Sequence, residues 1–363
     1  MASSRRMTLD GILTQCVERK GVEVAGIVDM HSRRVQEDLT RLLDQGRLAD
    51  TRAGLLWDPG VLILPACELE VACSEGPAHF VCYFPHNERI ILFSRWLGRY
   101  MVNPDLSSQR VRVTPDDLLR AVEDHGGTLV PAHAFTPFKS IYASSGGIEK
   151  TFTRPEAIHA VELGLSADAE MASWVPELEG RVFLSSSDAH SPEKIGREVN
   201  VMRLEAFSTE AVMDAVCGRG PSFIATNIGL DPRLGKYHRT RCEICQHVAV
   251  VDPPVTRCPS CHSNRVVLGV LDRVWMIRGD KFHPPAPYIH QVPLEFIPGV
   301  GRSKVDSLSG NATEMHVLHE ADEDELRRLL GPRAATYVMG ARAGQLDVEA
   351  GGGGIYGRLR STS

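Results

Sequence analysis

The sequence lacks any long hydrophobic run. No stretch of about 18 uncharged apolar residues, which a membrane-spanning helix needs, occurs in the chain. The first residues, Met1 to Arg6, also lack the apolar segment of a secretory signal peptide. These absences argue against membrane-spanning and secreted classes and predict a soluble, cytoplasmic protein.

The chain is neither poor in apolar residues nor evenly charged. Apolar residues make up 43% of its 363 residues, enough to build real cores, so global disorder and fibrous structure are excluded. The length allows about two or three domains. The formal charge of −6 hides a basic segment, because Arg233 to Lys281 holds nine Lys or Arg against four Asp or Glu. A basic segment in an acidic protein predicts one region that binds a polyanion.

Four of the nine cysteines form two matching pairs. The pairs Cys242-x-x-Cys245 and Cys258-x-x-Cys261 are separated by twelve residues. Two thiolates on one tight turn need a second pair to complete a tetrahedron around a metal, and this spacing supplies that pair. We therefore predict a closed structural zinc site, in preference to four unrelated buried cysteines.

The stretch from Thr8 to about Val201 alternates helical segments with short β-branched or aliphatic runs, which is typical of a parallel α/β unit. The predicted strands are Val22 to Val28, Val61 to Pro65, Phe80 to Phe84, Leu129 to Pro131, Ala160 to Leu163 and Val182 to Leu184. The predicted helices are Arg6 to Arg19, Pro115 to Asp124 and Ser208 to Val216. Such strands need helices over their outer faces, so a barrel or a doubly wound sheet is expected.

The C-terminal part has a different composition. Pro284 to Pro287 predicts a linker or a rigid extended strap, and helical sequence then continues to about Ala343. Between them Gly299 and Gly301, followed by Lys304, are typical of the hairpin of a helix-hairpin-helix, which binds DNA phosphates through backbone N–H groups. An ordinary helix C-cap and turn is the alternative. Gly351 to Gly354 predict a flexible tail or a loop whose backbone lies very close to a partner.

Potential metal ligands stand at or beside the ends of predicted strands, where a parallel α/β barrel gathers its active-site residues. They are His31, Glu68, His79, His133, Asp188 and His190. Imidazoles and carboxylates together suit zinc, manganese or iron, and a multi-metal cluster would favour hydrolysis of a phosphate ester. Taken singly, each residue is more often an ordinary core or surface group. Asp188 and His190 are the stronger pair, because alternation on an extended segment puts both on one face.

The later motifs, Pro131-Ala132-His133 and Ser187-Asp188-Ala189-His190, resemble those of the PHP (polymerase and histidinol phosphatase) superfamily. The order of segments from about Met7 to about Arg358 more specifically resembles the endonuclease Q family. The segments that carry this resemblance are Ser107 to Arg110, His133 to Ser140, Glu162 to Ser166, Gly235 to Thr240, the four cysteines, Pro287 to Leu294 and Gly351 to Gly354.

The resemblance implies a distorted (β/α)7 barrel of the PHP type, a four-cysteine zinc ribbon and a small helix-hairpin-helix region. It divides the chain into a catalytic domain at residues 1–224, a basic zinc-ribbon domain at 225–283 and a DNA-binding region at 284–363. It implies two or three divalent ions (Zn, Mg or Mn) held by the six ligands above, with Asp188, His190, His133 and Glu68 as the catalytic set.

The same resemblance implies a DNA repair endonuclease, associated with the nucleoid, that cuts 5′ of a deaminated base or an abasic site. Its partner would be damaged double-stranded DNA, and a replication clamp is a further partner to consider. Tyr142 is the candidate for the pocket that receives the damaged base. The candidate DNA-binding residues are Arg110, Lys139, Lys236, Tyr237, His238, Arg239, Gly299, Gly301 and Lys304.

One departure from the family pattern leaves alternatives open. The family opens with a strand that carries an Asp-x-His-x-His motif, and no such motif stands upstream of Thr8. We expect the natural protein to begin earlier, because a barrel without that strand would have an unpaired edge. The rivals are a PHP phosphoesterase without lesion preference and a catalytically inactive DNA-binding protein.

Overall fold

A computed structural model describes residues 7–105, 108–308 and 310–360. Met1 to Arg6 lie outside the described residues, and they include Arg6, the first residue of the predicted helix Arg6 to Arg19. Ser107 of one family segment also lies outside them. Within the described ranges no helix combines the length and the apolar character needed to cross a bilayer.

The strands are β1 (Val24–Ile27), β2 (Leu48–Thr51), β3 (Gly54–Trp57), β4 (Val61–Ala72), β5 (Pro77–Tyr83), β6 (Arg110–Val111), β7 (Thr128–Pro131), β8 (Ala160–Glu162), β9 (Val182–Leu184), β10 (Val199–Arg203), β11 (Phe223–Leu230), β12 (Arg241–Cys242), β13 (Val266–Val267), β14 (Tyr288–Gln291), β15 (Val348–Glu349) and β16 (Arg358–Leu359). The α-helices are α1 (Leu9–Gln15), α2 (Arg33–Asp44), α3 (Asn87–Leu97), α4 (Pro115–Asp124), α5 (Ile141–Ser144), α6 (Ile148–Thr151), α7 (Ala169–Ala172), α8 (Thr209–Cys217), α9 (Val270–Ile277), α10 (Arg302–Asp306), α11 (Glu323–Leu330) and α12 (Pro332–Arg342).

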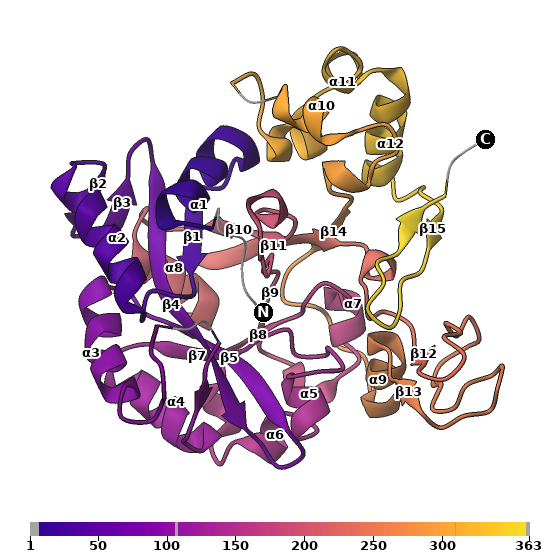
Figure 1. Cartoon of the computed structure of the whole chain (residues 1–363), viewed down its shortest axis with the longest axis horizontal. Coiled ribbons are helices and arrows are strands. Elements are labelled where there is room, and N and C mark those ends of the chain that lie inside the picture. The colour runs from indigo at the N-terminus through magenta and orange to yellow at the C-terminus, as the bar shows by residue number, and fades with distance from the viewer. Residues whose placement is uncertain (1–6, 106–107, 309, 361–363) are drawn as a thin grey trace.

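A curved wall of strands forms the centre of the molecule, with α2, α3, α4 and α6 around its outside (Figure 1). Strand β4 pairs in parallel with β1 and antiparallel with β5, and β5 pairs antiparallel with β7. The backbone N–H of Ala134, just after β7, donates to Glu162 O at the end of β8, which in turn pairs in parallel with β9. The side chain of Asn227 then joins β11 to Phe183 O of β9 at 2.8 Å.

The prediction of an all-parallel unit is wrong at β5, which runs antiparallel to both of its neighbours. Only Cys73 to Gly76 separate β4 from β5, and a parallel pair needs a crossover of a dozen or more residues. The mixed α/β class is confirmed, whereas a closed seven-stranded barrel remains a prediction.

Most of the individual strands and helices predicted from the sequence are present. The six predicted strands and the helices Pro115–Asp124 and Ser208–Val216 are present, with Thr114 capping α4 as expected. The predicted first helix is found as α1 followed by a π-helical turn, Cys16–Lys20, that ends at Gly21. Strand β4 extends seven residues past its predicted end, because its side chains are buried almost throughout and show no alternation that marks its limits.

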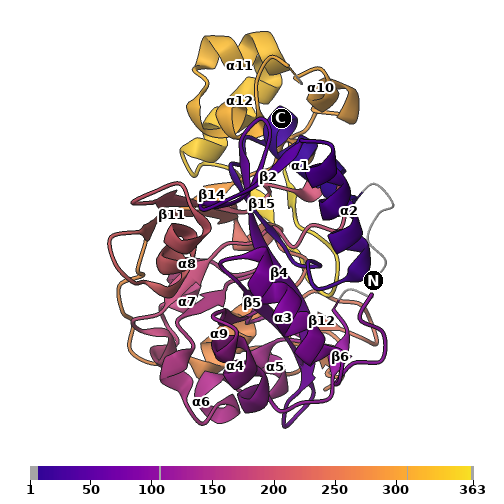
Figure 2. The same cartoon turned by 90° about the vertical axis from the view of Figure 1, so that its left-hand side faces the viewer.

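The C-terminal helices α10, α11 and α12 stand together at one end of the molecule in both views (Figures 1 and 2). They share an apolar core that includes Val317, Leu326 and Val338. Lys20 reaches this part from the N-terminal side, and its buried ammonium pairs with the buried carboxylate of Glu314. The boundary predicted at residue 224 falls inside β11, and α9 packs into the main core, so the three-domain division remains a prediction.

The glycine run Gly351 to Gly354 lies against its own chain. Gly351 donates to Arg233 O and accepts from Arg239 N, and Gly354 donates to Lys236 O. A Cβ on Gly351 would lie 2.5 Å from Gly235 O, so only glycine permits this approach. The run is therefore a close-lying backbone loop, but its neighbour is the chain's own segment from Arg233 to Arg239, and a close approach to a partner remains a prediction.

A buried carboxyl, Glu198, lies between β10 and β11. Its Oε1 accepts a 3.1 Å hydrogen bond from Leu230 N, and its Oε2 has no hydrogen-bond partner among the described residues. Burial raises the pKa of Glu198 to about 8, and the hydrogen bond from Leu230 only partly opposes this shift. The folded protein therefore holds Glu198 protonated at neutral pH.

We expect this proton to make stability depend on pH. Between the ordinary glutamate pKa, about 4.3, and about 8, the folded state binds more protons than the unfolded chain, so the free energy of unfolding falls as pH rises. Glu198→Gln, which keeps the acceptor, should remove a fall on the order of 2–5 kcal/mol between pH 5 and 8. Urea unfolding at both pH values measures this, with the exposed Glu205→Gln as the control. An equal pH dependence in both variants would contradict the expectation.

Candidate metal centres

Three predicted ligands from three consecutive strands of the wall converge. Glu68 lies in β4, His79 in β5, and His133 two residues after β7. Their potential ligand atoms all lie within 4.8 Å of one another. We call Glu68, His79 and His133 the carboxylate–histidine cluster, and it fits the donor set of a zinc or manganese site.

The register of β4 and β5 explains the convergence. Glu70 stands directly opposite His79, and Glu68 opposite Val81. Because side chains alternate along a strand, Glu68, Glu70 and His79 share one face of the pair. His79 consequently lies between two carboxylates, with Nδ1 3.1 Å from Glu68 Oε1 and Nε2 3.5 Å from Glu70 Oε2.

Glu68 is held in its ionised form. Burial alone would raise its pKa, but the hydrogen bond with His79 and the charges of His133 and His79 outweigh burial and lower the pKa to about 2. The hydroxyl of Ser108 also donates to Glu68 Oε1. The carboxylate is therefore ready to accept a cation at any pH near neutrality.

His133 is held in an unusual backbone conformation. Its φ of 32° lies in the left-handed region, which non-glycine residues rarely adopt and which concentrates at functional sites. Its Nδ1 lies 3.0 Å from Thr136 Oγ1, which leaves Nε2 as the nitrogen available for a metal. Gly164 provides the room, since a Cβ there would lie 3.0 Å from His133 Cβ.

Asp188 and His190 stand beside this cluster and outside the compact group. Asp188 Oδ1 lies 3.4 Å from His190 Nε2, and both side chains are about half exposed. Burial lowers the pKa of His133, and the charge of Asp188, like that of Glu68, opposes the shift, so Asp188 is close enough to act on His133.

Arg197 holds the segment that carries these two residues. Its Nε donates to Ser187 O at 2.7 Å and its Nη2 to Asp188 O at 3.0 Å, while Nη1 donates to Tyr356 Oη at 3.0 Å. Asp188 also has a left-handed φ, 43°. The buried guanidinium thus stabilises a strained turn and ties it to the C-terminal segment.

His31, the remaining predicted ligand, is buried just beyond β1. Glu68 N donates to Val28 O at 3.0 Å, which places the end of β1 beside Glu68, so His31 lies at the same end of the strands as Glu68. It is not part of the compact group formed by the described residues.

Glu162 is a site residue that the sequence analysis did not single out as a ligand or an acid. It lies at the end of β8, where its carboxyl accepts from Tyr83 Oη at 3.2 Å and from His133 N at 3.4 Å. Burial raises the pKa of Glu162 to about 7, and the charges of Glu68 and Asp188 add to the shift. Its position at a predicted strand end was the available signal, but its burial could not be read from the sequence.

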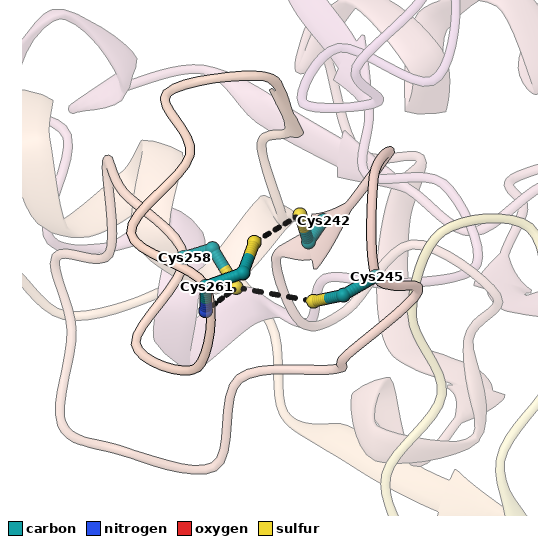
Figure 3. Close-up of side chains that lie close together, drawn as sticks. All are labelled: Cys242, Cys245, Cys258 and Cys261. Carbon is teal, nitrogen blue, oxygen red and sulfur yellow. Dashed lines mark hydrogen bonds between the residues drawn. The ribbon is translucent and has the colours of Figure 1, made fainter.

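The four cysteines form a second centre, as predicted (Figure 3). The Sγ atoms of Cys242 and Cys261 are 3.5 Å apart and those of Cys245 and Cys258 are 3.6 Å apart. Zinc–sulfur bonds of about 2.3 Å give tetrahedral edges of roughly 3.8 Å, so this spacing fits one zinc ion. The N–H groups of Cys261 and Ser260 lower the pKa of Cys258 to about 6, which favours the thiolate that a metal needs.

The predicted DNA-binding residues fall into two groups. Arg110 and Lys139 are half exposed or more, and both bind Glu70, at 2.8 and 2.9 Å. Lys236 lies 5.1 Å from the ring centroid of Tyr237. Arg110 and Lys139 stand beside the carboxylate–histidine cluster, because Glu70 also lies 3.5 Å from His79 Nε2. Binding of a polyanion by these residues remains a prediction.

The others make contacts within the chain. His238 is buried beside Ser166 O, Arg239 donates to Ala249 O, and Lys304 donates to Leu330 O. Gly299 and Gly301 form an open turn, but only a single 3-10 turn, Leu294–Phe296, precedes it in place of a first helix. Their roles in DNA binding, and the helix-hairpin-helix itself, remain predictions.

Tyr142 is buried in α5, and its ring stacks on Phe135 with centroids 4.9 Å apart. It also lines a cavity of about 420 Å³ with residues of α6 and α9, including Glu149, Lys150 and Ile277. None of the compact cluster lines that cavity. Its role in a base pocket remains a prediction.

The chain was compared with protein-family models and with curated proteins. No protein-family model matches the chain. The chain is 40% identical over 369 residues to the uncharacterized protein YqxK of Bacillus subtilis, an alignment that covers 99% of this chain and 94% of the relative. It is 34% identical over 251 residues to an uncharacterized protein of Methanocaldococcus jannaschii, covering 62% of this chain and 31% of that protein.

Two solved structures match almost the whole fold. One is the lesion-specific endonuclease PfuEndoQ from Pyrococcus furiosus, with a TM-score of 0.85, 27% identity, and coverage of 99% of this chain and 92% of that one. The other is endonuclease Q in complex with a 27-mer duplex substrate with an abasic lesion at the active site, with a TM-score of 0.85, 27% identity, and coverage of 99% and 93%.

We predict that Gly164→Ala displaces His133. The added methyl group would crowd the His133 side chain, and the left-handed φ of 74° adds strain. Binding of Mn²⁺ or Zn²⁺ to the carboxylate–histidine cluster should weaken by about tenfold or more, as measured by calorimetric titration. Gly180→Ala is the matched control, because Gly180 has a φ of 77° but open space around it. Equal metal affinity in both variants would contradict a positioning role for Gly164.

We also predict that Cys258→Ser removes one zinc ion per chain and loosens the ribbon. Because the segment around β12 and β13 is small, its folding depends on the metal. Metal analysis should show the loss, and limited proteolysis should cut between the two cysteine pairs. The matched control is Cys73→Ser, a cysteine outside the group. Unchanged zinc content in Cys258→Ser would refute the assignment.

Proposed function

The chain belongs to the endonuclease Q family, and from this we propose that it is a DNA repair endonuclease. It hydrolyses a phosphodiester on the 5′ side of a deaminated base (uracil, hypoxanthine or xanthine) or an abasic site, and leaves 3′-OH and 5′-phosphate ends. The observation that carries the proposal is the convergence of Glu68, His79 and His133, on a fold matched over 99% of the chain by an endonuclease bound to an abasic duplex.

The proposed site holds two or three divalent ions, with Zn, Mg or Mn as the candidates, and the carboxylate–histidine cluster supplies three of its ligands. Ions bound there would neutralise the scissile phosphate and lower the pKa of a coordinated water. The fit rests on chemistry within the chain: Glu68 is ionised, and Thr136 fixes the His133 ring with Nε2 free. His31, Asp188 and His190 complete the proposed ligand set, and the turn held by Arg197 orients the last two.

Glu162 has a distinct part in this proposal. Its pKa of about 7 leaves it partly protonated, so at neutral pH it carries less negative charge beside Glu68 and Asp188 than an ordinary glutamate would. By accepting from His133 N it fixes the strained backbone of the ligand. We assign Glu162 to positioning, because its carboxyl is buried beneath the cluster and away from solvent.

DNA approaches this site over a rim of basic residues. Arg110 and Lys139 both bind Glu70 and are half exposed or more, so each has N–H donors left for phosphate. Lys236 borders the same rim through Tyr237. The four-cysteine ribbon, the Gly299–Gly301 turn and Lys304 would add contacts farther along the duplex, and a replication clamp remains a predicted partner.

A nicking assay tests the proposal directly. A 5′-labelled duplex with one uracil, hypoxanthine or abasic site should be cut once, 5′ of the lesion, when Mn²⁺ or Mg²⁺ is supplied. Asp188→Asn should lower the rate about 100-fold or more, because it weakens a ligand of the proposed set. Asp214→Asn, at an aspartate on α8 that is likewise about half exposed, should leave the rate unchanged.

Two outcomes would favour the rivals. Equal cleavage of damaged and undamaged duplex would indicate a phosphoesterase without lesion preference. Binding of damaged duplex without cleavage, in a chain that holds about one zinc ion, would indicate an inactive DNA-binding protein.

A further inference from the structure

Phe138 is a large apolar residue that stands exposed next to the carboxylate–histidine cluster. Its side chain is 55% exposed, although it lies only five positions after the ligand His133. The flanking residues Ala134, Phe135 and Ile141 are all fully buried. Single exposed hydrophobic residues are common, so exposure alone carries no conclusion.

The backbone around Phe138 is firmly held. Phe138 O accepts from Thr136 Oγ1 at 3.0 Å, and the next carbonyl, Lys139 O, accepts from His79 N at 2.9 Å. Ser140 Oγ closes the loop by donating to Thr136 O at 2.6 Å. All three bonds involve His79 of the cluster or Thr136, which contacts His133, so the backbone that carries the phenyl ring is held in a fixed position relative to the cluster.

The surroundings of the ring are aromatic and basic. Phe138 meets Tyr237 edge to face, with centroids 5.8 Å apart, and Lys236 lies over the face of Tyr237. Tyr237 is anchored by its backbone, which donates to Ser166 Oγ and accepts from Val270 N. Lys139, the next residue after Phe138, is half exposed. An exposed ring flanked by ammonium groups suits a nucleobase beside phosphates better than an apolar protein partner.

We propose that Phe138 is a specificity-determining residue that stacks in the helix of a damaged duplex. Its ring enters the space left between neighbouring base pairs when the lesion nucleotide is extruded toward the cluster, and Tyr237 supports the ring from the side. This inference rests on the proposed function, because it takes damaged duplex DNA as the ligand. To the proposed function this inference adds Phe138 as the residue that keeps the gap in the duplex open.

The physical reason is the cost of extrusion. Removing a nucleotide from the stack leaves the flanking base pairs without a stacking partner, and an inserted apolar side chain restores part of that contact. In a single strand no flanking base pair has to be separated from its neighbour, so the ring has less to contribute. A stacking residue of this kind therefore acts on duplex far more than on single-stranded DNA carrying the same lesion.

The test compares Phe138→Ala with Phe138→Trp and Phe223→Ala. Trp keeps an aromatic face, and Phe223 is about equally exposed, at 49%. Phe223 is the first residue of β11, and Leu230, the last residue of that strand, contacts Glu198. Phe223 therefore lies about 20 Å along the strand from the contact with Glu198. The probes are an abasic duplex and its isolated lesion strand. Affinity is measured in EDTA by fluorescence anisotropy, and extrusion by the emission of 2-aminopurine next to the lesion.

Phe138→Ala should bind the abasic duplex about tenfold or more weakly than wild type and lose the 2-aminopurine signal. It should bind the single strand within about threefold of wild type, and Phe138→Trp and Phe223→Ala should behave as wild type. Equal losses on duplex and single strand, or no loss at all, would overturn the proposal.

The binding readout separates this inference from the proposed function. Wild-type protein that binds the abasic duplex selectively but never nicks it would defeat the proposed function, while the comparison of variants would still decide the role of Phe138. Wild-type protein that binds abasic and undamaged duplex equally would overturn both.

Discussion

The antiparallel insertion of β5 between β4 and β7 is the constraint on which the candidate site depends. It brings His79 to the same face as Glu68 and Glu70, and it places the end of β7, with His133 beyond it, at the same edge. A shift of β5 by one residue in the β4–β5 register would turn His79 to the face opposite Glu68 and Glu70. The short link between β4 and β5 fixes that register, and the almost fully buried β4 holds it in the core.

The charges of the site are balanced by burial and by neighbours. Glu68 is kept ionised by the histidines around it, whereas burial keeps Glu162 partly protonated nearby. Glu70 is neutralised by Arg110 and Lys139, which draws two cations to the rim of the site. The interior thus avoids an accumulation of uncompensated negative charge, and the surface keeps positive groups where a phosphate backbone would approach.

Contacts between segments far apart in the sequence tie the N-terminal part and the site to the C-terminal region. Arg197 links the turn at Asp188 to Tyr356 near the C-terminus, and Lys20 links the N-terminal turn to Glu314. The glycine run at Gly351 lies along the Arg233–Arg239 segment, which includes the basic and aromatic residues of the rim. The metal-binding loops and the C-terminal region are therefore parts of one hydrogen-bonded structure, although their sequences suggest separate modules.

Features that depend on neighbours along the chain could be predicted from the residues alone. The four-cysteine centre follows from two tight turns, helix α4 from Thr114 and Pro115, and the strand runs from their apolar residues. The same reasoning marked His79, His133 and Glu68 as ligands, because they stand in or beside strands. The folded chain was needed to show that β5 runs antiparallel, that Glu162 is buried beneath His133, and that Phe138 meets Tyr237. Those features arise from contacts between residues that are distant in sequence. Such contacts depend on which apolar faces pack together, and a local sequence pattern does not specify that packing.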